Sequence, residues 1–447
     1  MTSARDFALV RLDSRNLPEW RPHCIARNLT ERVEPPADPR DRALAEQLET
    51  GVIKNLLQLQ HLIEMYADRP LPKIHPALQK ILAVAIYQLR FLDRVPVSAA
   101  VDEAVDQAKR FGMRHAAGFT NAVLRKATTE RKTPLPDLPD ATQTASVHWS
   151  HPQELFARFS KTFGDQQALA ICKHDNTEPP TIVRLCAGKT LNDLTVAGAQ
   201  CLPHNQPGFA IVQSPARPLL AEISRNGIAQ VQDPTAASVI PSAELSAGKT
   251  VLDRCCGMGT KTLQAWEYAG PTAAIVAIDP APSRCKALLE MLAARSVTNV
   301  RVVQSEEFPG SMTDIPQVYD LCLLDVPCSN SGVLARRPEA RYSQSARAMS
   351  QLQSLQQNIL TDTAQRTKHG GKLIYSTCSL WPEENQEIVQ WFLALYTDYH
   401  LVREQTTLPS CSDNLADYHD GGYFAILERA YERPAGATNQ GTKQDVA

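Results

Sequence analysis

The stretch VLDRCCGMGTKT, Val251–Thr262, decides the fold. An apolar run ends in an acid, a turn containing Gly257 and Gly259 comes next, and the residues after the turn favour a helix. This order is typical of the first strand, turn and helix of a doubly wound sheet, where glycines let the backbone approach a ligand closely at the helix N-terminus. Because a lone G-x-G is common in loops, its meaning depends on the strands and helices around it.

Short apolar runs and amphipathic stretches alternate regularly after this turn. The alternation predicts a doubly wound, Rossmann-like α/β domain over 236–430. The predicted strands are Thr250–Leu252, Ala274–Ile278, Val300–Val303, Leu321–Leu324 and Leu373–Tyr375, and the predicted helices are Lys261–Tyr268, Ser283–Ala294, Met349–Ala364 and Glu384–Ala394.

The N-terminal half of the chain predicts two further domains. Apolar residues recur at intervals of three and four from residue 38 to 131, which predicts an all-α domain. A Pro-rich linker over 132–147 leads to a small α+β module over 148–235. A polar N-terminal extension (1–37) and a disordered tail (431–447) flank these domains.

Length and composition narrow the class of protein. The 447 residues, 43% hydrophobic and 21% charged, fit a globular chain of two to three domains at roughly 150 residues each. No run approaches a membrane span or a signal peptide, which predicts a cytoplasmic protein, expected to be a monomer. The 11 cysteines include no C-x-x-C and no zinc spacing, so neither a disulfide framework nor a metal site is expected.

Acids come after the second and third predicted strands. Asp279 ends the run IVAIDP about twenty residues after the glycine turn, where an acid can bind the hydroxyls of a cofactor ribose. The alternative for Asp279 is a cap on the next helix, and both roles can coexist. Glu306 comes after the third strand and could contact an adenine amine, or it could be an ordinary solvated carboxylate.

Two cysteines and a further acid are predicted at the same edge of the sheet. Asp325 and Cys328 come after the fourth strand in LLDVPCSNSG, and Cys378 comes after the next strand in LIYSTCSLWPEEN. One such cysteine would be interpreted as buried core, whereas two of them beside an acid favour a catalytic crevice.

Thiols beside an adenosine-binding site suit one kind of chemistry. Carbon-5 of cytosine is a weak nucleophile until a thiolate adds to carbon-6, and an acid near ring nitrogen-3 stabilises the adduct. S-adenosylmethionine would then supply the methyl group. A redox function, with Cys328 and Cys378 forming a disulfide, is the competing interpretation, but their separate strands and the lack of C-x-x-C disfavour it.

The pair DVPCSNSG and YSTCSLWPEEN closely resembles the D-A-P-C-S and T-C-S-x-x-P-E-E-N motifs of RNA 5-methylcytosine methyltransferases. VQDPTAASVI resembles the segment that enters the catalytic domain of that family, and residues 78–126 resemble a NusB-like RNA-binding domain. This domain order resembles the RsmB (Sun, Fmu) type, which acts on bacterial small-subunit ribosomal RNA, and the likeness spans about residues 40–430.

The resemblance implies a role for each matching residue. Cys378 matches the nucleophile, Cys328 matches the cysteine that assists release of the methylated base, and Asp325 matches the acid at the target cytosine. Asp279 matches the acid that binds the cofactor ribose, and Glu306 stands where the family usually has Asp. The remaining S-adenosylmethionine-binding positions implied by the resemblance are Cys255, Cys256, Gly257, Met258, Gly259, Thr260, Lys261 and Asp325 itself.

The cofactor loop departs from the family pattern D-x-C-A-A-P-G-G-K-T. Gly257-Met258 replaces Ala-Pro, and Thr260 replaces the second glycine. Losing a fixed proline φ and a flexible glycine predicts a lower cofactor affinity. The corresponding alternative function is an RNA-binding ribosome assembly factor with impaired cofactor binding.

A basic stretch, LARRPEARY, comes after the first cysteine motif. Its three arginines, Arg336, Arg337 and Arg341, are either a solvated loop or contacts to RNA phosphates, and Tyr342 could stack on a base.

Overall fold

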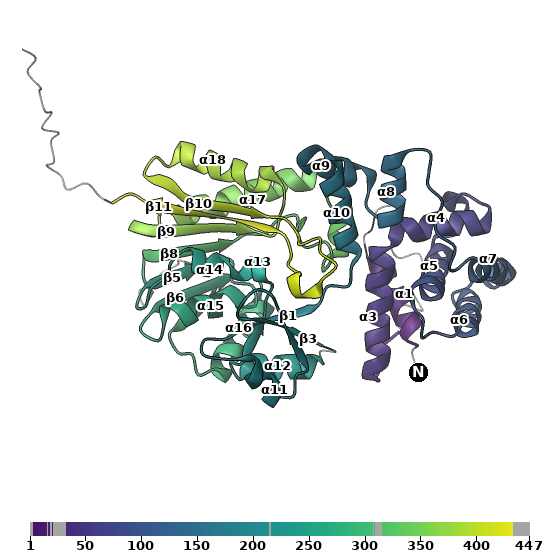
Figure 1. The fold of residues 1–447 in the computed structure, drawn as a ribbon, viewed down its shortest axis with the longest axis horizontal. Coiled ribbons are helices and arrows are strands. Elements are labelled where there is room, and N and C mark those ends of the chain that lie inside the picture. The colour runs from purple at the N-terminus through teal and green to yellow at the C-terminus, as the bar shows by residue number, and fades with distance from the viewer. Residues whose placement is uncertain are drawn as a thin grey trace, which may run out of the picture. The chain divides into compact units, whose positions relative to one another are not determined.

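The computed structural model describes residues 3–15, 17, 20, 33–213, 216–306, 308 and 315–431 (Figure 1). The chain divides into two compact units. The helical unit comprises residues 1–179 and 334–344, and the sheet unit comprises residues 180–333 and 345–447. The chain therefore leaves the sheet unit after Val333, contributes one short segment to the helical unit, and returns at Ser345.

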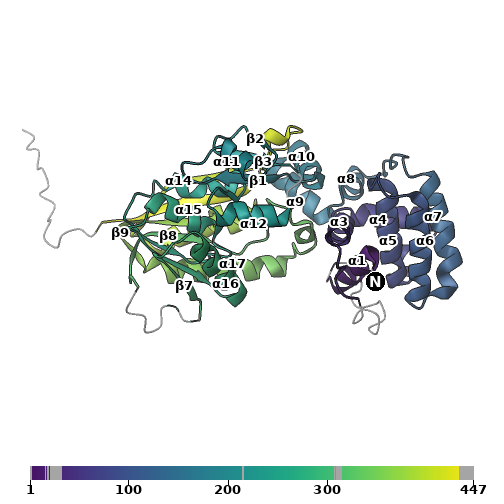
Figure 2. The same cartoon turned by 90° about the horizontal axis from the view of Figure 1, so that it is seen from below.

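The helical unit is built around α5 (Pro76–Phe91), which is buried on nearly every side from Ala77 to Leu89. Its apolar sequence all round predicts this central position. The helices of the unit, several of which lie side by side in Figure 2, are α1 (Ala4–Ser14), α3 (Pro39–Lys54), α4 (Leu56–Ala67), α6 (Val97–Arg110), α7 (Ala117–Thr129), α8 (Ala141–Trp149), α9 (Gln153–Phe163) and α10 (Asp165–Asn176).

The helical core extends beyond the boundaries expected from the sequence. Helix α1, which falls in the expected extension 1–37, buries Leu9 and Leu12 completely against the same core. Asp13 of α1 pairs with the buried Lys80 at 2.6 Å. The apolar stripe along α1 is short and the rest of its sequence is polar, so hydrophobic periodicity alone does not predict this helix. Helix α8 likewise begins inside the expected linker, and the expected tail lies outside the described residues from 432 onward.

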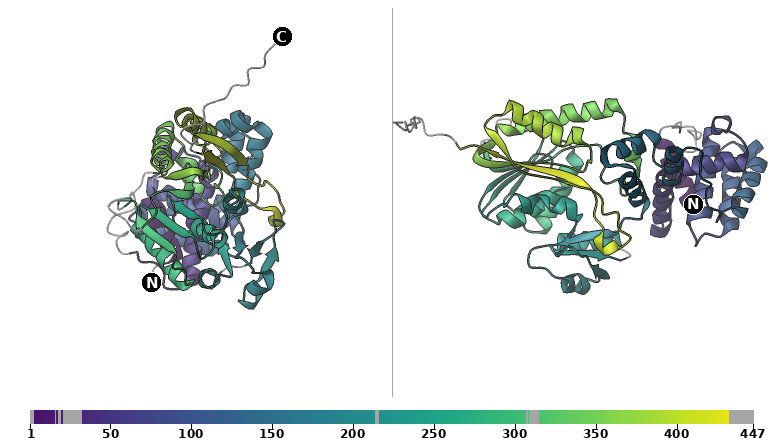
Figure 3. Two further views of the ribbon diagram at one scale, coloured as in Figure 1. Left: turned by 90° about the vertical axis from the view of Figure 1, so that its left-hand side faces the viewer. Right: turned by 45° about the horizontal axis from the view of Figure 1, so that its top comes forward.

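The sheet unit contains a seven-stranded sheet of order β10-β11-β9-β8-β5-β6-β7. All five predicted strands are present, and the sheet is mixed because β11 runs antiparallel to both its neighbours, β9 and β10. The strands are β5 (Thr250–Asp253), β6 (Ala274–Asp279), β7 (Val300–Gln304), β8 (Tyr319–Asp325), β9 (Thr367–Thr377), β10 (Tyr399–Thr407) and β11 (Gly422–Arg429). The two C-terminal strands, yellow in Figure 3, were not predicted.

Helices cover both faces of this sheet (Figure 1). Helices α14 (Val239–Ser242), α15 (Thr260–Ala269) and α16 (Pro282–Ala294) pack on one face, and α17 (Ala346–Ala364) and α18 (Gln386–Leu395) pack on the other. Strand β8 shows why its sequence is apolar throughout: Leu321 and Leu323 enter one core, and Cys322 and Leu324 enter the other. The carboxyl ends of β5, β6, β8 and β9 therefore meet at one edge.

A smaller antiparallel sheet of order β2-β3-β1-β4 precedes the large one in the sheet unit. It consists of β1 (Thr181–Leu185), β2 (Cys201–Pro203), β3 (Phe209–Val212) and β4 (Ala229–Val231), with α11 (Leu191–Val196) and α12 (Arg217–Arg225). The expected module 148–235 is thus divided between the units, because α9 and α10 group with the helices. No helix among the described residues combines the length and apolarity that crossing a bilayer requires.

Candidate functional site

The two predicted catalytic cysteines lie side by side at the edge where β8 and β9 end. The Sγ atoms of Cys328 and Cys378 are 3.2 Å apart, and the Cys378 thiol also donates to Asn330 Oδ1 at 3.3 Å. Both are free thiols. The hydrogen bond with Cys378, together with burial, raises the pKa of the Cys328 thiol well above its ordinary value. The two thiols thus form one coupled pair.

A buried carboxylate, which the sequence pattern does not single out, ties the two cysteine loops together. Glu384 is fully buried, and its Oε1 accepts from the Ser329 amide at 2.9 Å and from Gln356 Nε2 at 3.1 Å. Its Oε2 accepts from the hydroxyls of Ser329 and Ser379, each at 2.5 Å. Ser329 and Ser379 directly succeed the two cysteines in the chain. The signal in the sequence is the pair of acids, Glu383 and Glu384, in the motif YSTCSLWPEEN that contains Cys378.

A contact between two glycines reinforces this connection. The Gly332 amide donates to the Cys378 carbonyl at 2.8 Å, and the Gly421 amide donates to the Gly332 carbonyl at 2.7 Å. A Cβ at Gly332 would lie 2.7 Å from the Gly421 carbonyl carbon and 2.9 Å from the Cys378 oxygen. Only glycine fits here, since real Cβ atoms do not approach backbone so closely.

Asp325 lies at the end of β8, as the sequence predicts, and is held by two partners. Its Oδ2 pairs with Lys261 Nζ at 2.8 Å, and its Oδ1 accepts from the Ser376 hydroxyl at 2.9 Å. Lys261 belongs to the first turn of α15, directly after the glycine loop. This ion pair therefore joins the predicted cofactor loop to the predicted base-contacting acid.

The glycine loop is held mainly through its backbone. The Cys256 amide donates to the Ile278 carbonyl at 2.8 Å, and the Gly257 amide donates to Asp279 Oδ2 at 3.0 Å. Gly257 and Gly259 have φ values of +55° and +87°, which favour glycine. A Cβ at Gly259 would also lie 2.2 Å from the Leu288 side chain. The local geometry therefore favours glycine at both positions, and at Gly259 the contact with Leu288 adds a steric reason.

Met258 and Thr260, which replace the proline and the second glycine of the family pattern, introduce no backbone strain. Thr260 is the first residue of α15 and does not have a positive φ, so a glycine is unnecessary there. Met258 is 67% exposed and has no core to fill. Cys255 is partly buried, and burial raises the pKa of its thiol to about 12, which argues against a reactive thiolate at this position.

Asp279 makes the contact to the turn before the next helix that the sequence allows, and it makes a second contact to the glycine loop that the sequence did not predict. Its Oδ1 accepts from the Ala281 amide at 2.8 Å, which stabilises the turn into α16, and its Oδ2 supports Gly257. Asp279 Oδ2 also accepts from Arg284 Nη1 at 3.5 Å, whereas Oδ1 keeps a lone pair for a further donor. The residues at this edge therefore fit an adenosine-type cofactor: two left-handed glycines, a helix N-terminus and an acid with remaining acceptor capacity.

An acid buried beneath the glycine loop, Asp253, has a raised pKa. Asp253 ends β5 and is nearly inaccessible, and its Oδ2 accepts from the Thr262 hydroxyl at 2.6 Å. Burial raises the pKa of Asp253 to about 7, and the charge of Asp325 adds to this effect. Asp253 Oδ1 has no hydrogen-bond partner among the described residues.

Glu306 lies two residues after β7 with its side chain exposed. The position of Glu306 after β7 is consistent with the predicted contact to the cofactor. That contact stays a prediction. Within the described ranges, no group of three or more His, Cys, Asp or Glu side chains is arranged to hold a metal ion.

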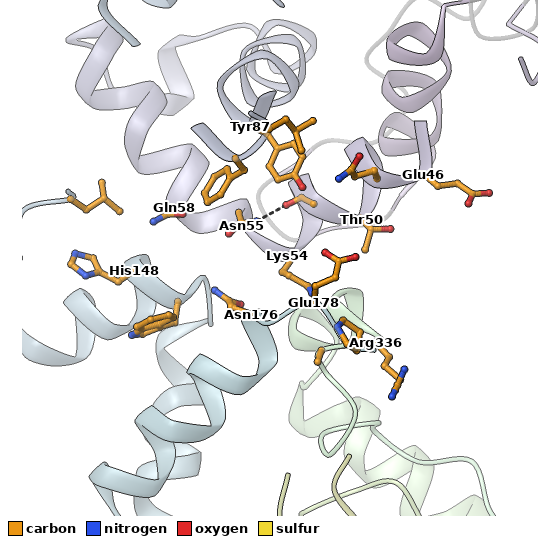
Figure 4. Close-up of a pocket in the computed structure, with 18 of the residues that line it drawn as sticks. Glu46, Thr50, Lys54, Asn55, Gln58, Tyr87, His148, Asn176, Glu178 and Arg336 are labelled. Atoms are coloured by element: carbon orange, nitrogen blue, oxygen red, sulfur yellow. Dashed lines mark hydrogen bonds between the residues drawn. The ribbon is translucent and has the colours of Figure 1, made fainter. Parts of the chain in front are cut away.

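The three arginines of LARRPEARY have three different environments, all within the helical unit. Arg341 is buried and donates to the carbonyls of Lys54 at 2.9 Å and Asp175 at 2.6 Å, so it is neither solvated nor available to phosphates. The Tyr342 hydroxyl donates to the Ile53 carbonyl at 3.1 Å, so the hydroxyl end of this ring is held inside the helical unit. Arg337 has an exposed side chain, and Arg336 lines a pocket (Figure 4).

Comparison with known proteins agrees with this arrangement. The family described as "16S rRNA methyltransferase RsmB/F" matches residues 242–420, and the NusB family matches residues 5–129. The second match begins before residue 38 and includes most of α1. The chain is 30% identical to the probable ribosomal RNA small subunit methyltransferase B of Synechocystis sp., over 96% of this chain and 100% of that protein.

Two solved structures have the same fold. "Crystal Structure of PH0851" matches with a TM-score of 0.74 at 18% identity, over 96% of this chain and 99% of that one. "The crystal structure of NSun6 from Pyrococcus horikoshii with SFG" matches with a TM-score of 0.51 at 18% identity, over 63% of this chain and 99% of that one. With a NusB-type helical domain, a Rossmann-like sheet and a relative matched over its full length, this chain belongs to the ribosomal RNA small subunit methyltransferase B family, RsmB/F.

Proposed function

We propose that this rRNA methyltransferase transfers a methyl group from S-adenosylmethionine to carbon-5 of a cytosine in 16S ribosomal RNA, through a covalent adduct with Cys378. The observation that carries the proposal is the 3.2 Å separation of the Cys328 and Cys378 sulfurs beside Asp325. Methyl transfer to a ring nitrogen or a ribose hydroxyl needs no thiol, whereas carbon-5 of cytosine must first be activated by a nucleophile at carbon-6.

The coupling of the thiols supports a division of roles. An ionised thiol disfavours ionisation of its neighbour, so the pair loses its first proton more readily than its second. Because Cys328 is buried whereas Cys378 is partly exposed, we assign the thiolate to Cys378 and the retained proton to Cys328, whose Sγ lies 3.2 Å away. Cys378 forms the sulfur–carbon-6 bond, and the electron pair of the carbon-5–carbon-6 double bond makes carbon-5 nucleophilic.

The same coupling explains how the product leaves. Once bonded to carbon-6, Cys378 carries no charge, so ionisation of Cys328 no longer places two negative charges side by side. Cys328 then loses its proton to solvent and accepts the carbon-5 proton of the methylated ring. The carbon-5–hydrogen electrons restore the ring double bond, the sulfur–carbon bond breaks, and Cys378 recovers its electron pair as thiolate.

Other residues position the ring and the cofactor. Asp325, fixed by Lys261 and Ser376, can accept from the exocyclic amine and from a protonated ring nitrogen-3. Gly257, Gly259 and Asp279 would hold S-adenosylmethionine, which supplies an electrophilic methyl group when bound. The NSun6 structure titled with SFG, an S-adenosylmethionine analogue, supports this cofactor. The target base must be unpaired to reach the thiols, and the ribosomal substrate implies a cytoplasmic location.

Bisulfite sequencing of 16S rRNA from cells with and without the gene tests the reaction and the substrate together. One cytosine protected in the wild type should become convertible on deletion, and wild-type protein but not Cys378→Ala should restore protection. If no cytosine changes, the cytosine carbon-5 assignment is wrong.

A further inference from the structure

Asn330, two residues after Cys328, contacts both cysteines of the thiol pair. Its Oδ1 accepts from the Cys378 thiol at 3.3 Å, and its Nδ2 donates to the Cys328 carbonyl at 3.0 Å. All three residues belong to the sheet unit. The Asn330 side chain therefore connects the loop after β8 to the sulfur that the proposed function makes the nucleophile.

The backbone of Asn330 has a left-handed conformation, with a φ of +61°. This conformation is uncommon outside glycine, because it brings Cβ close to a backbone oxygen. Asparagine tolerates it better than most residues, since its short side chain can hydrogen-bond locally. A glycine would avoid the cost altogether, so the contacts of the Asn330 side chain are the reason to have a side chain at this position.

The orientation of the Asn330 amide group follows from its neighbours. Turning the amide by 180° would place Oδ1 against the Cys328 carbonyl oxygen, and neither atom carries a hydrogen. Nδ2 therefore faces the Cys328 carbonyl, and the atom that faces the Cys378 sulfur is an acceptor. The hydrogen in the contact between Asn330 and Cys378 must then belong to the Cys378 thiol.

This contact gives the thiol pair a direction. A thiol carries a single hydrogen, so a Cys378 hydrogen that points to Asn330 cannot also point to Cys328. The hydrogen in the 3.2 Å contact between the two sulfurs then belongs to Cys328, and the Cys378 sulfur accepts it. A hydrogen bond that a sulfur accepts stabilises its thiolate, whereas a hydrogen bond that a thiol donates is lost when that thiol ionises.

We propose that Asn330 is a catalytic residue that selects Cys378, rather than Cys328, as the attacking thiol. The inference rests on the proposed function, in which one thiol attacks and the other keeps its proton. The Cys378 proton leaves on the side of the partly exposed Asn330 and passes to water, because an amide oxygen is too weak a base to keep it. The electron pair left on the Cys378 sulfur forms the bond to carbon-6.

Alkylation of the thiols by iodoacetamide, in the full-length protein without RNA, tests the selection directly. Because the thiolate is the reactive form, wild-type protein should be labelled faster at Cys378 than at Cys328, as measured by mass spectrometry of the two peptides. Asn330→Gly suits the left-handed backbone and leaves the Cys378 hydrogen free to point to Cys328. The ratio of labelling at Cys378 to labelling at Cys328 should therefore fall by about 5-fold or more.

Three comparisons separate this role from a structural one. Ser296→Gly is the matched control, since Ser296 is an exposed residue of the sheet unit with a φ of +55°, and it should leave the labelling ratio unchanged. Asn330→Asp tolerates the same backbone and keeps an acceptor beside Cys378, so it should retain most of the selectivity that Asn330→Gly loses. The completely buried Cys322 should stay unlabelled in every variant, which shows that the fold is intact.

The proposal is overturned by an unchanged labelling ratio in Asn330→Gly, or by an equal loss of selectivity in Asn330→Asp. Labelling of Cys322 in Asn330→Gly would overturn it as well, because the side chain would then be needed for the fold.

Methyl transfer to a 16S rRNA transcript is measured in parallel. Asn330→Gly should lower kcat about 10-fold and leave the KM for RNA within about 2-fold of the wild-type value. An unchanged kcat with a raised KM would make Asn330 a substrate-binding residue and overturn the proposal. The expected shift in labelling without cytosine methylation by wild-type protein refutes only the proposed function. Cytosine methylation with an unchanged labelling ratio and kcat in Asn330→Gly refutes only the role of Asn330.

Discussion

The thiol loops and the glycine loop lie at the same sheet edge but are held in different ways. Side chains hold the thiol loops: Glu384 accepts from Ser329 and Ser379, and Gly332 leaves no room for any larger residue. Backbone amides and left-handed glycines hold the glycine loop, in which Met258 is exposed and Thr260 has an ordinary backbone conformation. Side-chain identity is therefore constrained throughout the first region, whereas in the second only the positions that fix the backbone are constrained.

This difference accounts for where the sequence departs from its family. The motifs around Cys328 and Cys378 differ from the family pattern only at Val326, whereas the glycine loop has changed at 256, 257, 258 and 260. Gly257 adopts the left-handed conformation, and Met258 and Thr260 occupy positions that tolerate substitution. The structure therefore removes the geometric reason for expecting lower cofactor affinity. Variants in both regions test the comparison, from the largest effect to the smallest.

Removing either thiol should have the largest effect and separate the two roles. We expect Cys378→Ala to abolish methyl transfer, by at least ~10³-fold, and to form no covalent RNA adduct. Cys328→Ala should accumulate an adduct, seen as a slow band on a denaturing gel, because the ring cannot lose its carbon-5 proton. Adducts from Cys378→Ala with none from Cys328→Ala would reverse the assignment.

Glu384→Gln tests whether side chains hold the thiol loops. The amide cannot accept from all four donors that Glu384 serves, so we expect about 1–3 kcal/mol lower stability and methyl transfer reduced roughly 10–100-fold. Rates are measured with saturating S-adenosylmethionine, and Glu383→Gln, the adjacent carboxylate, is the matched control. Equal behaviour of the two variants would show that the network does not position the thiols.

Asp253→Asn tests the raised pKa beneath the glycine loop. Because the folded-state pKa of about 7 lies above the ordinary value, the folded protein binds the proton more tightly, and stability falls as pH rises from about 4 to about 7. The neutral variant should lack this decrease in stability. At pH 8 it should be more stable than the wild type, by up to roughly 1.4 kcal/mol per unit of pKa shift. Thermal midpoints at pH 5 and pH 8 give the comparison, and parallel pH profiles for the two proteins would refute it.

The glycine loop should respond least, and unevenly. Thr260→Gly restores the family residue, yet we expect the S-adenosylmethionine Kd to change less than about 3-fold, since Thr260 is already unstrained at a helix start. Gly257→Ala should weaken binding about 10-fold, because a left-handed conformation costs an alanine roughly 1–2 kcal/mol. Isothermal calorimetry measures both. No detectable heat with wild-type protein would favour the alternative of an RNA-binding assembly factor. A large gain in S-adenosylmethionine affinity for Thr260→Gly would show that the altered loop does lower cofactor affinity.

The elements and residues that could be predicted from the sequence are those whose local residue pattern matches their local structure. The five strands of the alternating region and the central helix α5 can be predicted from apolar periodicity, and Asp325, Cys328 and Cys378 from their position after strands. Sequence reasoning failed for α1, whose apolar positions are few, and for the β10–β11 hairpin, whose outer strand is largely exposed. It also interpreted Arg341 by its charge, although this residue is buried among carbonyls.

The sequence by itself determined the fold class and the residues at the carboxyl edge of the sheet, because strand ends, turns and capped helices are local properties of the chain. Only the tertiary structure decided which residues hold that edge in place. Glu384 meets Ser329 from 55 positions away, Gly332 meets Gly421 backbone to backbone, and Arg341 folds back onto Lys54, 287 positions earlier. Such contacts depend on distances across the folded chain, which no local pattern of residues encodes.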